Sequence, residues 1–422
     1  MFYISGFHKA KSLYCNGSKI FWYSKKRAQI KNVSWTRGGT NYAYSVTKRS
    51  KKNPRASLQF QICFPYADDE VCLCYAIPYT YSDLLKSIDH WDNIAKPGVF
   101  KHETLCSTDG GRDCPILTIT SPNNTIPLEK RKYIFITGRI HPGESNSSFL
   151  VHGLIDFLLS DTPEANYIIE STIIKCVPMM NIDGVVEGFY RVSLSGNDLN
   201  RMWTAPDLIL HPVVYHTKSL IRKIVSEKGC TFYIDFHGHS RLHGTFIYGC
   251  PNDDDHEFRN SEKIYPGILS LLSDTFSLSH CVFSFPQERK SAGRIVVRTE
   301  FNILNSYTVE TSFGGVFAGG CANCLYDETL WKEIGEKCGL AIYHYLLDDN
   351  SQYTKYAKKK VELLAPKTLP VSQNQEKEKI QIDMTNKSDC FGKRKFTEDD
   401  ISSVSLGVKQ PKWERISFKL EK

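Results

Sequence analysis

The sequence predicts an α/β fold that follows a small β domain. Between residues 79 and 348, strand-like runs alternate with helix-like stretches, as in KYIFITGRI followed by SNSSFLVHGLIDFLLS. Such alternation is typical of a largely parallel or mixed sheet with helices on both faces. Residues 1–78 instead contain short aromatic and β-branched runs (KIFWYS, NYAYSVT, SLQFQICF) separated by turn residues. That pattern predicts a small antiparallel β domain.

The last segment, residues 349–422, loses apolar periodicity and is rich in Lys, Glu, Gln, Ser and Asn. Such a composition buries too little apolar surface to offset the conformational entropy that ordering would cost. The sequence therefore predicts three parts: an amino-terminal β domain over 1–78, a main domain over 79–348, and a charged, disordered tail over 349–422 that is dispensable for chemistry.

Composition narrows the class of protein. The chain has 422 residues, of which 41% are hydrophobic and 23% charged, which excludes a collagen, a coiled coil or a wholly disordered chain. No apolar run reaches the roughly 18 residues of a membrane-spanning helix, and the start lacks the apolar core of a signal peptide. The 14 cysteines are scattered along the chain, so we expect reduced thiols in a soluble intracellular protein without a membrane partner.

The net charge of +7 is unevenly distributed. Residues 1–67 hold 13 Lys and Arg and no Asp or Glu, and residues 351–422 hold 16 basic against 10 acidic residues. Basic flanks of this kind attract acidic polymers such as nucleic acids or acidic peptide tails, although a merely solvated basic surface explains them equally well. Because nothing else in the sequence supports nucleic-acid binding, we do not expect it.

The strongest sign of chemistry is the string His141-Pro-Gly-Glu144, which lies between a predicted strand and a predicted helix. An imidazole and a carboxylate three residues apart on a loop can bind one zinc ion, and a catalytic zinc needs a third protein ligand and an open position for water. His237 is our candidate for that ligand because it ends the predicted strand TFYIDF. His239 and His243 are alternatives.

A polar string from Arg191 to Arg201 offers groups that bind a substrate. Arg201 with Asn200 is suited to hold the terminal carboxylate of a peptide, because a guanidinium binds a carboxylate through two parallel hydrogen bonds. Arg191 is suited to stabilise an oxyanion, and Asp198 to hydrogen-bond a metal-bound histidine. The alternative is an exposed loop with ordinary surface ion pairs.

Glu310 lies in the apolar strand-like run SYTVETSFGG. A carboxylate in such a run is costly unless it pairs with another group or acts in chemistry. Beside zinc, Glu310 would take a proton from water and pass it to a leaving amine. The alternative is a glutamate that faces solvent on an edge strand.

Several motifs together resemble the cytosolic carboxypeptidases, a subfamily of the zinc carboxypeptidases whose members shorten glutamate chains on tubulin and other proteins. They are His141-Pro-Gly-Glu144, Asn181-Ile-Asp-Gly184, the string NDLNR ending at Arg201, DFHGHS around His237 and SYTVETSFGG around Glu310, and the match runs from about residue 10 to 348. The chain begins part-way through the family's amino-terminal domain, so we expect a shortened antiparallel β-sandwich before the carboxypeptidase domain.

The resemblance implies one zinc ion per chain, with His141, Glu144 and His237 as its ligands. It also implies that Glu310 is the catalytic glutamate and that Arg191, Asn200 and Arg201 anchor the substrate. Glutamylated tubulin or other acidic protein tails are the implied partners, in the cytosol or on microtubules and cilia.

The resemblance further assigns the pocket for the released side chain to Arg294, just ahead of the predicted Glu310 strand. An arginine there would pair with a glutamate side chain and disfavour an apolar one. The alternative is a surface arginine on an edge strand, in which case Lys290 and Arg298 compete for the role. Two other functions remain open at this stage: a microtubule-associated binding module with weak catalysis, and a zinc deacylase of the aspartoacylase kind.

Overall fold

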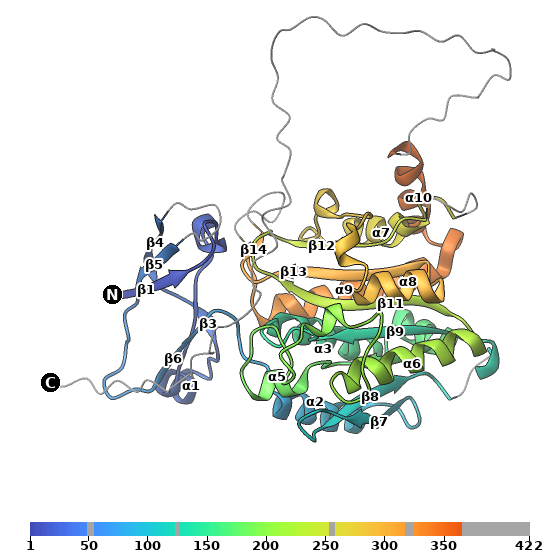
Figure 1. The fold of residues 1–422 in the computed structure, drawn as a ribbon, viewed down its shortest axis with the longest axis horizontal. Helices are drawn as coiled ribbons and strands as arrows, with labels where there is room; N and C mark the ends of the chain where they lie inside the picture. Colours follow the sequence, from blue (N-terminus) through green and yellow to red (C-terminus); the bar gives the residue numbers. More distant parts are fainter. Residues whose placement is uncertain (49–54, 123–125, 253–257, 317–323, 365–422) are drawn as a thin grey trace, which may run out of the picture.

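The computed structural model describes residues 1–48, 55–122, 126–252, 258–316 and 324–364 (Figure 1). Its body is a mixed seven-stranded sheet with helices packed around it, and two small antiparallel sheets form the N-terminal region beside the body. This arrangement confirms the α/β fold and the antiparallel strands that the sequence predicts ahead of it.

The seven-stranded sheet has the order β12-β13-β11-β9-β10-β8-β7. Strands β13, β11, β9 and β10 run parallel at its centre, and β12, β8 and β7 pair antiparallel at the two sides. Their bounds are β7 Phe100–Ser107, β8 Asp113–Ile119, β9 Lys132–Gly138, β10 Thr172–Val177, β11 Cys230–His239, β12 Thr245–Tyr248 and β13 Asn305–Ser312. Because parallel strands present their carboxyl ends at one edge, residues that follow β9 and β11 meet there.

Helices cover both faces of this sheet, as two adjacent residues of β11 show. Neighbouring residues of a strand point to opposite faces. The ring of Phe232 lies 5.2 Å from that of Tyr265 and 4.8 Å from that of Tyr345, whereas the ring of Tyr233 lies 5.8 Å from that of Trp203. Tyr265 and Tyr345 belong to α7 and α9, whereas Gly293 of α8 lies against Trp203 and Tyr233, so helices lie on both faces.

The α-helices of the body are α2 Tyr81–Ile94, α3 Ser145–Leu158, α4 Pro163–Ser171, α5 Ile182–Val186, α6 Pro212–Glu227, α7 Ile264–Leu272, α8 Gly293–Phe301, α9 Glu328–Leu347 and α10 Gln352–Leu364. Short 3-10 turns are η1 Leu13–Asn16, η2 Leu128–Lys130, η3 Leu199–Arg201, η4 Ser261–Lys263, η5 Leu278–His280, η6 Gln287–Arg289 and η7 Asp348–Asn350. Within the described part of the chain, no helix is long and apolar enough to cross a membrane.

Helices α3 and α9 cross with their backbones in contact. A Cβ added to Gly153 of α3 would collide with the backbone of Lys332, and one added to Gly335 of α9 would collide with the backbone of Leu150. Only glycine therefore fits at the crossing point. This close contact fixes α3, whose N-terminus carries the site described below, against the rest of the body.

The N-terminal region consists of two three-stranded antiparallel sheets, β1-β5-β4 and β3-β2-β6. Their bounds are β1 Phe2–Phe7, β2 Phe21–Ser24, β3 Thr36–Arg37, β4 Thr40–Lys48, β5 Arg55–Gln61 and β6 Val71–Cys74, with α1 Lys25–Lys31 after β2. A further two-stranded ribbon pairs β14 Gly315–Val316 with β15 Cys324–Leu325. Leu58 and Phe60 of one N-terminal sheet share an apolar cluster with Trp22 and Leu73 of the other. The two small sheets therefore have a common core.

Arg37 connects the N-terminal region to the body. Its guanidinium donates to the carbonyls of Phe313 (2.5 Å) and Tyr326 (2.7 Å), and to that of Lys19 at 2.6 Å. It also lies 3.9 Å from the ring centroid of Phe21. Burial lowers the pKa of Arg37 to about 10, so the guanidinium remains charged at neutral pH. Because these carbonyls come from both parts of the chain, Arg37 holds the small sheets against the body.

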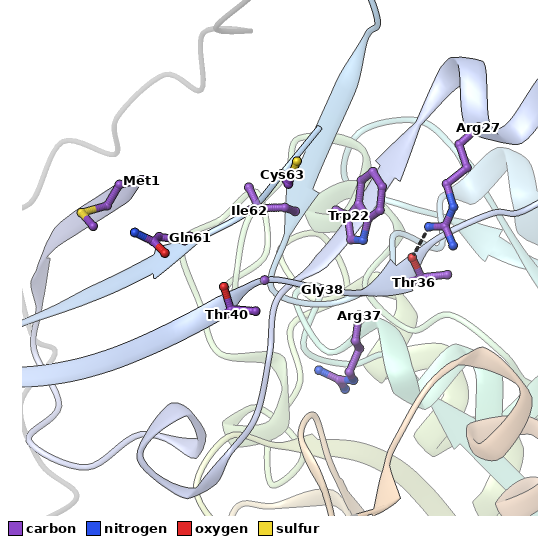
Figure 2. Close-up of a pocket in the computed structure, with 11 residues that line it drawn as sticks. Met1, Trp22, Arg27, Thr36, Arg37, Gly38, Thr40, Gln61, Ile62 and Cys63 are labelled. Atoms are coloured by element: carbon purple, nitrogen blue, oxygen red, sulfur yellow. Dashed lines mark hydrogen bonds between the residues drawn. The ribbon is translucent and has the colours of Figure 1, made fainter. Parts of the chain in front are cut away.

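The N-terminal region also contains a pocket of about 620 Å³ (Figure 2). It is lined by Met1, Trp22, Arg27, Thr36, Arg37, Gly38, Gly39, Thr40, Gln61, Ile62 and Cys63. Arg27 already donates to the Thr36 hydroxyl at 2.7 Å and lies over the Trp22 ring. None of the site residues predicted from the sequence lines this pocket, so it lies apart from the predicted chemistry.

The predicted disorder of residues 349–422 is wrong for the first part of that segment. Helix α10 continues the fold after η7, and its residues Thr354 and Ala357 are buried. Ala357 packs on α7, where it lies next to Gly267. The buried positions of α10 are small side chains, which a search for large apolar residues overlooks. The remaining part of the predicted tail, residues 365–422, lies outside the described residues.

We expect Ala357→Glu to lower the free energy of unfolding by about 3 kcal/mol, because an unpaired charge would be buried between α10 and α7. Tyr356→Glu introduces the same residue at the preceding position, which is exposed, and should leave stability within about 0.5 kcal/mol. Urea denaturation followed by circular dichroism measures both changes. Equal stability of the two variants would show that α10 does not pack on the body.

Candidate metal centre and active site

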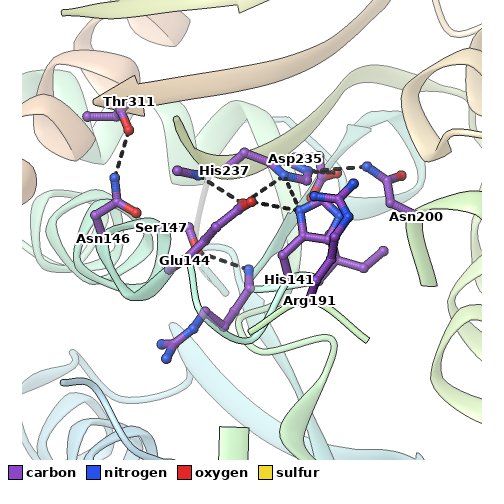
Figure 3. A network of polar contacts seen from close by, with 12 residues as sticks. His141, Glu144, Asn146, Ser147, Arg191, Asn200, Asp235, His237 and Thr311 are labelled. Atoms are coloured by element: carbon purple, nitrogen blue, oxygen red, sulfur yellow. Dashed lines mark hydrogen bonds and ion pairs between the residues drawn. The ribbon is translucent and has the colours of Figure 1, made fainter. Parts of the chain in front are cut away.

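Three buried side chains meet at the carboxyl edge of the sheet (Figure 3). His141 and Glu144 lie on the loop between β9 and α3, and His237 lies near the end of β11. Nδ1 of His141 is 2.9 Å from one Glu144 carboxylate oxygen, Nδ1 of His237 is 3.0 Å from the other, and the two Nδ1 atoms are 3.2 Å apart. The structure thus brings together the three residues that the sequence analysis proposed as metal ligands.

The arrangement fits zinc. Zinc binds imidazole nitrogen and carboxylate oxygen at about 2.0–2.2 Å, so two ligand atoms of a tetrahedral site lie about 3.3 Å apart. The observed separations among His141, Glu144 and His237 are close to that value. Within the described part of the chain, the ligand atoms of His141, Glu144 and His237 all lie within 4.8 Å of one another, which is close enough to bind one metal ion.

Each histidine is oriented by a second carboxylate. Nε2 of His237 lies 2.6 Å from Asp235, and Nε2 of His141 lies 3.2 Å from Asp198. A neutral histidine whose Nε2–H donates a hydrogen bond to a carboxylate keeps the Nδ1 lone pair for a metal. Asp235 is fixed in turn by the Thr137 hydroxyl, which donates to it at 2.8 Å. The contact of Asp198 is the one that the sequence analysis expected.

Asp235 is a functional residue without a predicted role from the sequence. Residues two apart on a strand share one face of the sheet, so Asp235 and His237 of β11 necessarily point the same way. That spacing was the available signal. Because Asp235 is fully buried, its carboxylate holds the His237 ring firmly in place.

The charges around the two rings favour a bound cation. Burial lowers the pKa of His237, but the carboxylates of Asp235 and Glu144 raise it by more, and the net pKa lies well above the ordinary value. Burial raises the pKa of Asp198, but His141 and Arg191 lower it by more, so this carboxyl is ionised at neutral pH. Three carboxylates around two imidazoles leave an excess of negative charge that a divalent cation would balance.

The two alternative histidines have other contacts. Nδ1 of His239 accepts a hydrogen bond from the backbone N–H of Leu242 at 2.8 Å, and burial lowers the pKa of this imidazole to about 4. Nε2 of His243 lies 2.7 Å from the amide nitrogen of Asn16. Neither ring belongs to the group around Glu144.

Arg139 supports the loop that carries His141 and Glu144. Its guanidinium is buried and donates to the carbonyls of Pro142 (2.8 Å) and Tyr79 (3.1 Å) and to the Ser148 hydroxyl (2.9 Å). Its φ of 55° lies in the left-handed region, which costs a non-glycine residue about 1–2 kcal/mol. No sequence pattern indicates this role of Arg139, because its partners become neighbours only when the loop folds around it.

Gly143 allows the same loop to approach Tyr190. The backbone N–H of Gly143 donates to the Tyr190 carbonyl at 2.8 Å, and a Cβ at this position would collide with the Tyr190 ring. A glycine is therefore required between His141 and Glu144. The contact also places Arg191, the residue after Tyr190, beside the metal group.

The predicted substrate-binding residues surround the metal group. Asp198 holds Arg191 through contacts of 2.7 and 2.9 Å, and Asn200 lies on η3 with its amide nitrogen 3.5 Å from Nε2 of His237. Burial lowers the pKa of Arg201, and Arg191, Arg289 and Arg294 lower it further while Asp198 raises it. Several guanidiniums therefore lie close enough to Arg201 to influence its charge. Of these, Arg289 was not identified from the sequence.

Glu310 lies beside His237. It belongs to β13, where it is paired in register with His237 of β11 on one side and with Phe246 of β12 on the other. The alternative of a solvent-facing glutamate on an edge strand is therefore wrong. Burial raises the pKa of Glu310 to about 7, with Glu144 raising it and His237 lowering it. A carboxyl group with a pKa near the working pH is suited to accept and return a proton.

Arg294 lies in the first turn of α8 and is 6% exposed, so the alternative of a surface arginine on an edge strand is also wrong. Its Nε is 3.5 Å from the Gly249 carbonyl, and its guanidinium lies 5.6 Å from the ring centroid of Tyr248. No carboxylate of the described residues forms a salt bridge with it. Of its two rivals, Lys290 is exposed, and Arg298 donates to two asparagines.

Comparison with known proteins identifies the family. The sequence pattern of the family described as "Zinc carboxypeptidase" matches residues 88–319, which is more than half of the chain. The chain belongs to the zinc carboxypeptidase family. Use of zinc is a property of this family, and the His141, Glu144 and His237 group has the donors for it.

Within this family, the chain is similar to cytosolic carboxypeptidases, as its motifs indicated. It is 36% identical to "Cytosolic carboxypeptidase 2" of Xenopus tropicalis over 358 residues, which are 83% of this chain and 37% of the relative. It is 34% identical to the human protein of the same name, over 84% of this chain and 40% of the relative. It is 33% identical to "Cytosolic carboxypeptidase 1" of Xenopus laevis, over 80% of this chain and 30% of the relative. The chain thus spans less than half of the length of these relatives.

Solved structures share the fold. A metallo-carboxypeptidase from Burkholderia cenocepacia has a TM-score of 0.61 at 22% identity, with 80% of this chain and 82% of the other covered. A putative carboxypeptidase A from Shewanella denitrificans has a TM-score of 0.63 at 23% identity, with 78% and 81% covered. These similarities confirm the carboxypeptidase fold that the sequence motifs implied.

We expect His237→Ala protein to lose its zinc, because the two remaining ligands hold a metal weakly. Asp235→Asn should keep the ligand atoms but lower zinc affinity about 10- to 100-fold, because the amide orients the His237 ring less well. Metal analysis after dialysis against graded chelator measures both effects, and His239→Ala serves as the matched control that should retain zinc. Full zinc occupancy in His237→Ala protein would contradict the assignment.

Proposed function

We propose that this protein is a zinc-dependent metallocarboxypeptidase that releases glutamate from acidic protein carboxyl termini or from polyglutamate side chains. The observation that carries the proposal is the buried Arg294 guanidinium near Glu310. A buried cation without a carboxylate partner is costly, and the side-chain carboxylate of a terminal glutamate would supply the missing partner.

In this proposal the guanidiniums bind both carboxylates of a terminal glutamate. Arg201 and Asn200 hold the main-chain carboxylate, and Arg294 holds the side-chain carboxylate. The side chain of Asn200 supports this arrangement, because its Oδ1 accepts a hydrogen bond from the Gly293 N–H at 2.9 Å and so joins η3 to the start of α8. A glutamate bound in this way places its peptide bond next to Glu144 and Glu310.

The chemistry then requires activated water and a proton carrier. Zinc, when bound, supplies Lewis-acid catalysis and activates water. Glu310 accepts a proton from the attacking water and returns it to the amine that leaves with the released glutamate. Arg191, which Asp198 holds at the site, stabilises the negative charge that develops on the scissile carbonyl oxygen.

The partner we propose is glutamylated tubulin or another acidic protein tail, in the cytosol. Two observations support this. The relatives are named cytosolic carboxypeptidases, and residues 1–67 carry 13 Lys and Arg without an acidic residue. A positive surface attracts a polyanionic tail and raises the rate of encounter.

We expect the protein to remove glutamates from glutamylated tubulin, with the loss read by mass spectrometry. Glu310→Gln should keep zinc and fold but turn over about 10²- to 10⁴-fold more slowly, because the amide cannot accept the proton. Binding of tubulin without loss of glutamate by either form would contradict the proposal and favour the microtubule-associated binding module.

We further expect Arg294→Leu to change the preference of the enzyme. Release of glutamate from a peptide should fall by about 10²-fold or more, as expected when a buried charge pair is broken, with some gain on a peptide ending in leucine. Lys290→Leu is the matched control, since this residue is exposed, and should leave the ratio of rates unchanged. If the ratio of the rates on the glutamate and leucine peptides is unchanged in Arg294→Leu, Arg294 does not determine the specificity of the enzyme.

A further inference from the structure

A lysine of the N-terminal region lies near the candidate metal centre. Lys9 follows β1, and its Nζ donates to the Ser240 hydroxyl at 3.0 Å. Ser240 comes three residues after His237, directly after the end of β11. The Lys9 backbone is held from β4, because the Tyr44 hydroxyl donates to the Lys9 carbonyl at 2.6 Å. The segment around Lys9 is therefore fixed at both of its sides.

A second contact joins the same two parts of the chain. Asn16 of η1 lies 2.7 Å from the ring of His243, on the loop between β11 and β12. The N-terminal region thus meets this loop at two points, one of which carries an ammonium group. This placement is why a residue so early in the chain lies near the metal ligands.

The charged neighbours of Lys9 are mostly cations. Burial lowers the pKa of Lys9, Arg241 and Arg191 lower it further, and Glu144 raises it. Arg191 is paired with Asp198, and Glu144 is one of the proposed metal ligands. Among the described residues, no carboxylate forms a salt bridge with Lys9. The lysine therefore adds positive charge near the metal group without an ion pair of its own among these residues.

The cations around the metal group divide into two sets. Arg289, Arg294 and Arg191 influence the pKa of Arg201, whereas Arg241 and Arg191 influence that of Lys9. Arg191 thus influences the pKa of both Arg201 and Lys9. The side chain of Tyr190, the residue before Arg191, hydrogen-bonds with Ser240, which is also the partner of Lys9. If the terminal glutamate occupies the Arg201 and Arg294 side, the preceding part of the substrate chain can therefore extend past Arg191 toward Lys9.

We propose that Lys9 is a specificity-determining residue that binds the side-chain carboxylate of a glutamate preceding the released one. This inference rests on the proposed function and refines it, because it requires an acidic residue upstream of the scissile bond as well as a terminal glutamate. A glutamate chain meets the requirement, since every residue carries a carboxylate. A tail with a single terminal glutamate does not.

The test compares two peptides that share a terminal glutamate and differ at the two preceding positions, which are glutamate in one and glutamine in the other. Lys9→Gln should lower kcat/KM on the glutamate-rich peptide about fivefold, the upper range for a solvent-exposed ion pair. It should leave the glutamine-containing peptide within about twofold. Lys9→Arg should retain the preference, and Lys11→Gln, an exposed lysine on the same segment, should behave as wild type.

Added salt provides a second readout. The preference of the wild type for the glutamate-rich peptide should shrink between about 0.02 and 0.5 M salt, because an exposed pair is screened. The Lys9→Gln variant should show little change in this ratio. A merely structural lysine would not alter the salt dependence of the ratio.

The outcomes separate the inference from the proposed function. An equal loss on both peptides would show that Lys9 only holds the N-terminal segment, and no loss would show that it does not contact substrate. Either result overturns the inference while the release of glutamate stands. If the wild type cleaves neither peptide, the proposed function fails. In that case, calorimetry measures the affinity of the protein for each peptide and so tests whether Lys9 binds an upstream glutamate. Equal affinities for the two peptides would overturn the inference.

Discussion

The interaction on which the site depends is the sharing of one carboxylate by two histidines. Glu144 contacts Nδ1 of both His141 and His237, and it also accepts a hydrogen bond from the Gly238 N–H at 3.0 Å. Glu144 is the residue that directly precedes α3, so this single side chain connects the ends of β9 and β11 to the start of a helix. Burial of so many polar groups is tolerable because each has a partner and because the cluster has the ligands of a zinc ion.

The surrounding fold fixes this cluster in place. The parallel pairing of β9, β11 and β13 brings Glu310 next to His237, and Arg139 holds the loop of His141 through hydrogen bonds. The tight crossing of α3 and α9 fixes the helix behind Glu144. The ends of neighbouring parallel strands thus supply ligands, base and loop support to one edge of the sheet, which is where open α/β sheets bind their ligands.

Local patterns and ordered motifs were sufficient to predict the α/β alternation, the candidate ligands and Glu310. They did not predict the features that depend on tertiary packing. Arg139 and Asp235 act through contacts formed in the folded state, and α10 packs through small side chains such as Ala357. The contact between Lys9 and Ser240 joins residues 231 positions apart, so no local pattern contains it. Arg294 was found by resemblance, but its place on a helix became clear only from the fold.

The most direct test of the central claim is a crystal structure of the zinc-loaded protein with anomalous diffraction recorded at the zinc edge. Our account predicts one zinc ion about 2.0–2.2 Å from Nδ1 of His141, Nδ1 of His237 and a carboxylate oxygen of Glu144. The Nε2 atoms should still face Asp198 and Asp235. A zinc ion bound through Nε2 of either ring, or bound elsewhere with these three side chains left as a hydrogen-bonded cluster, would contradict the account.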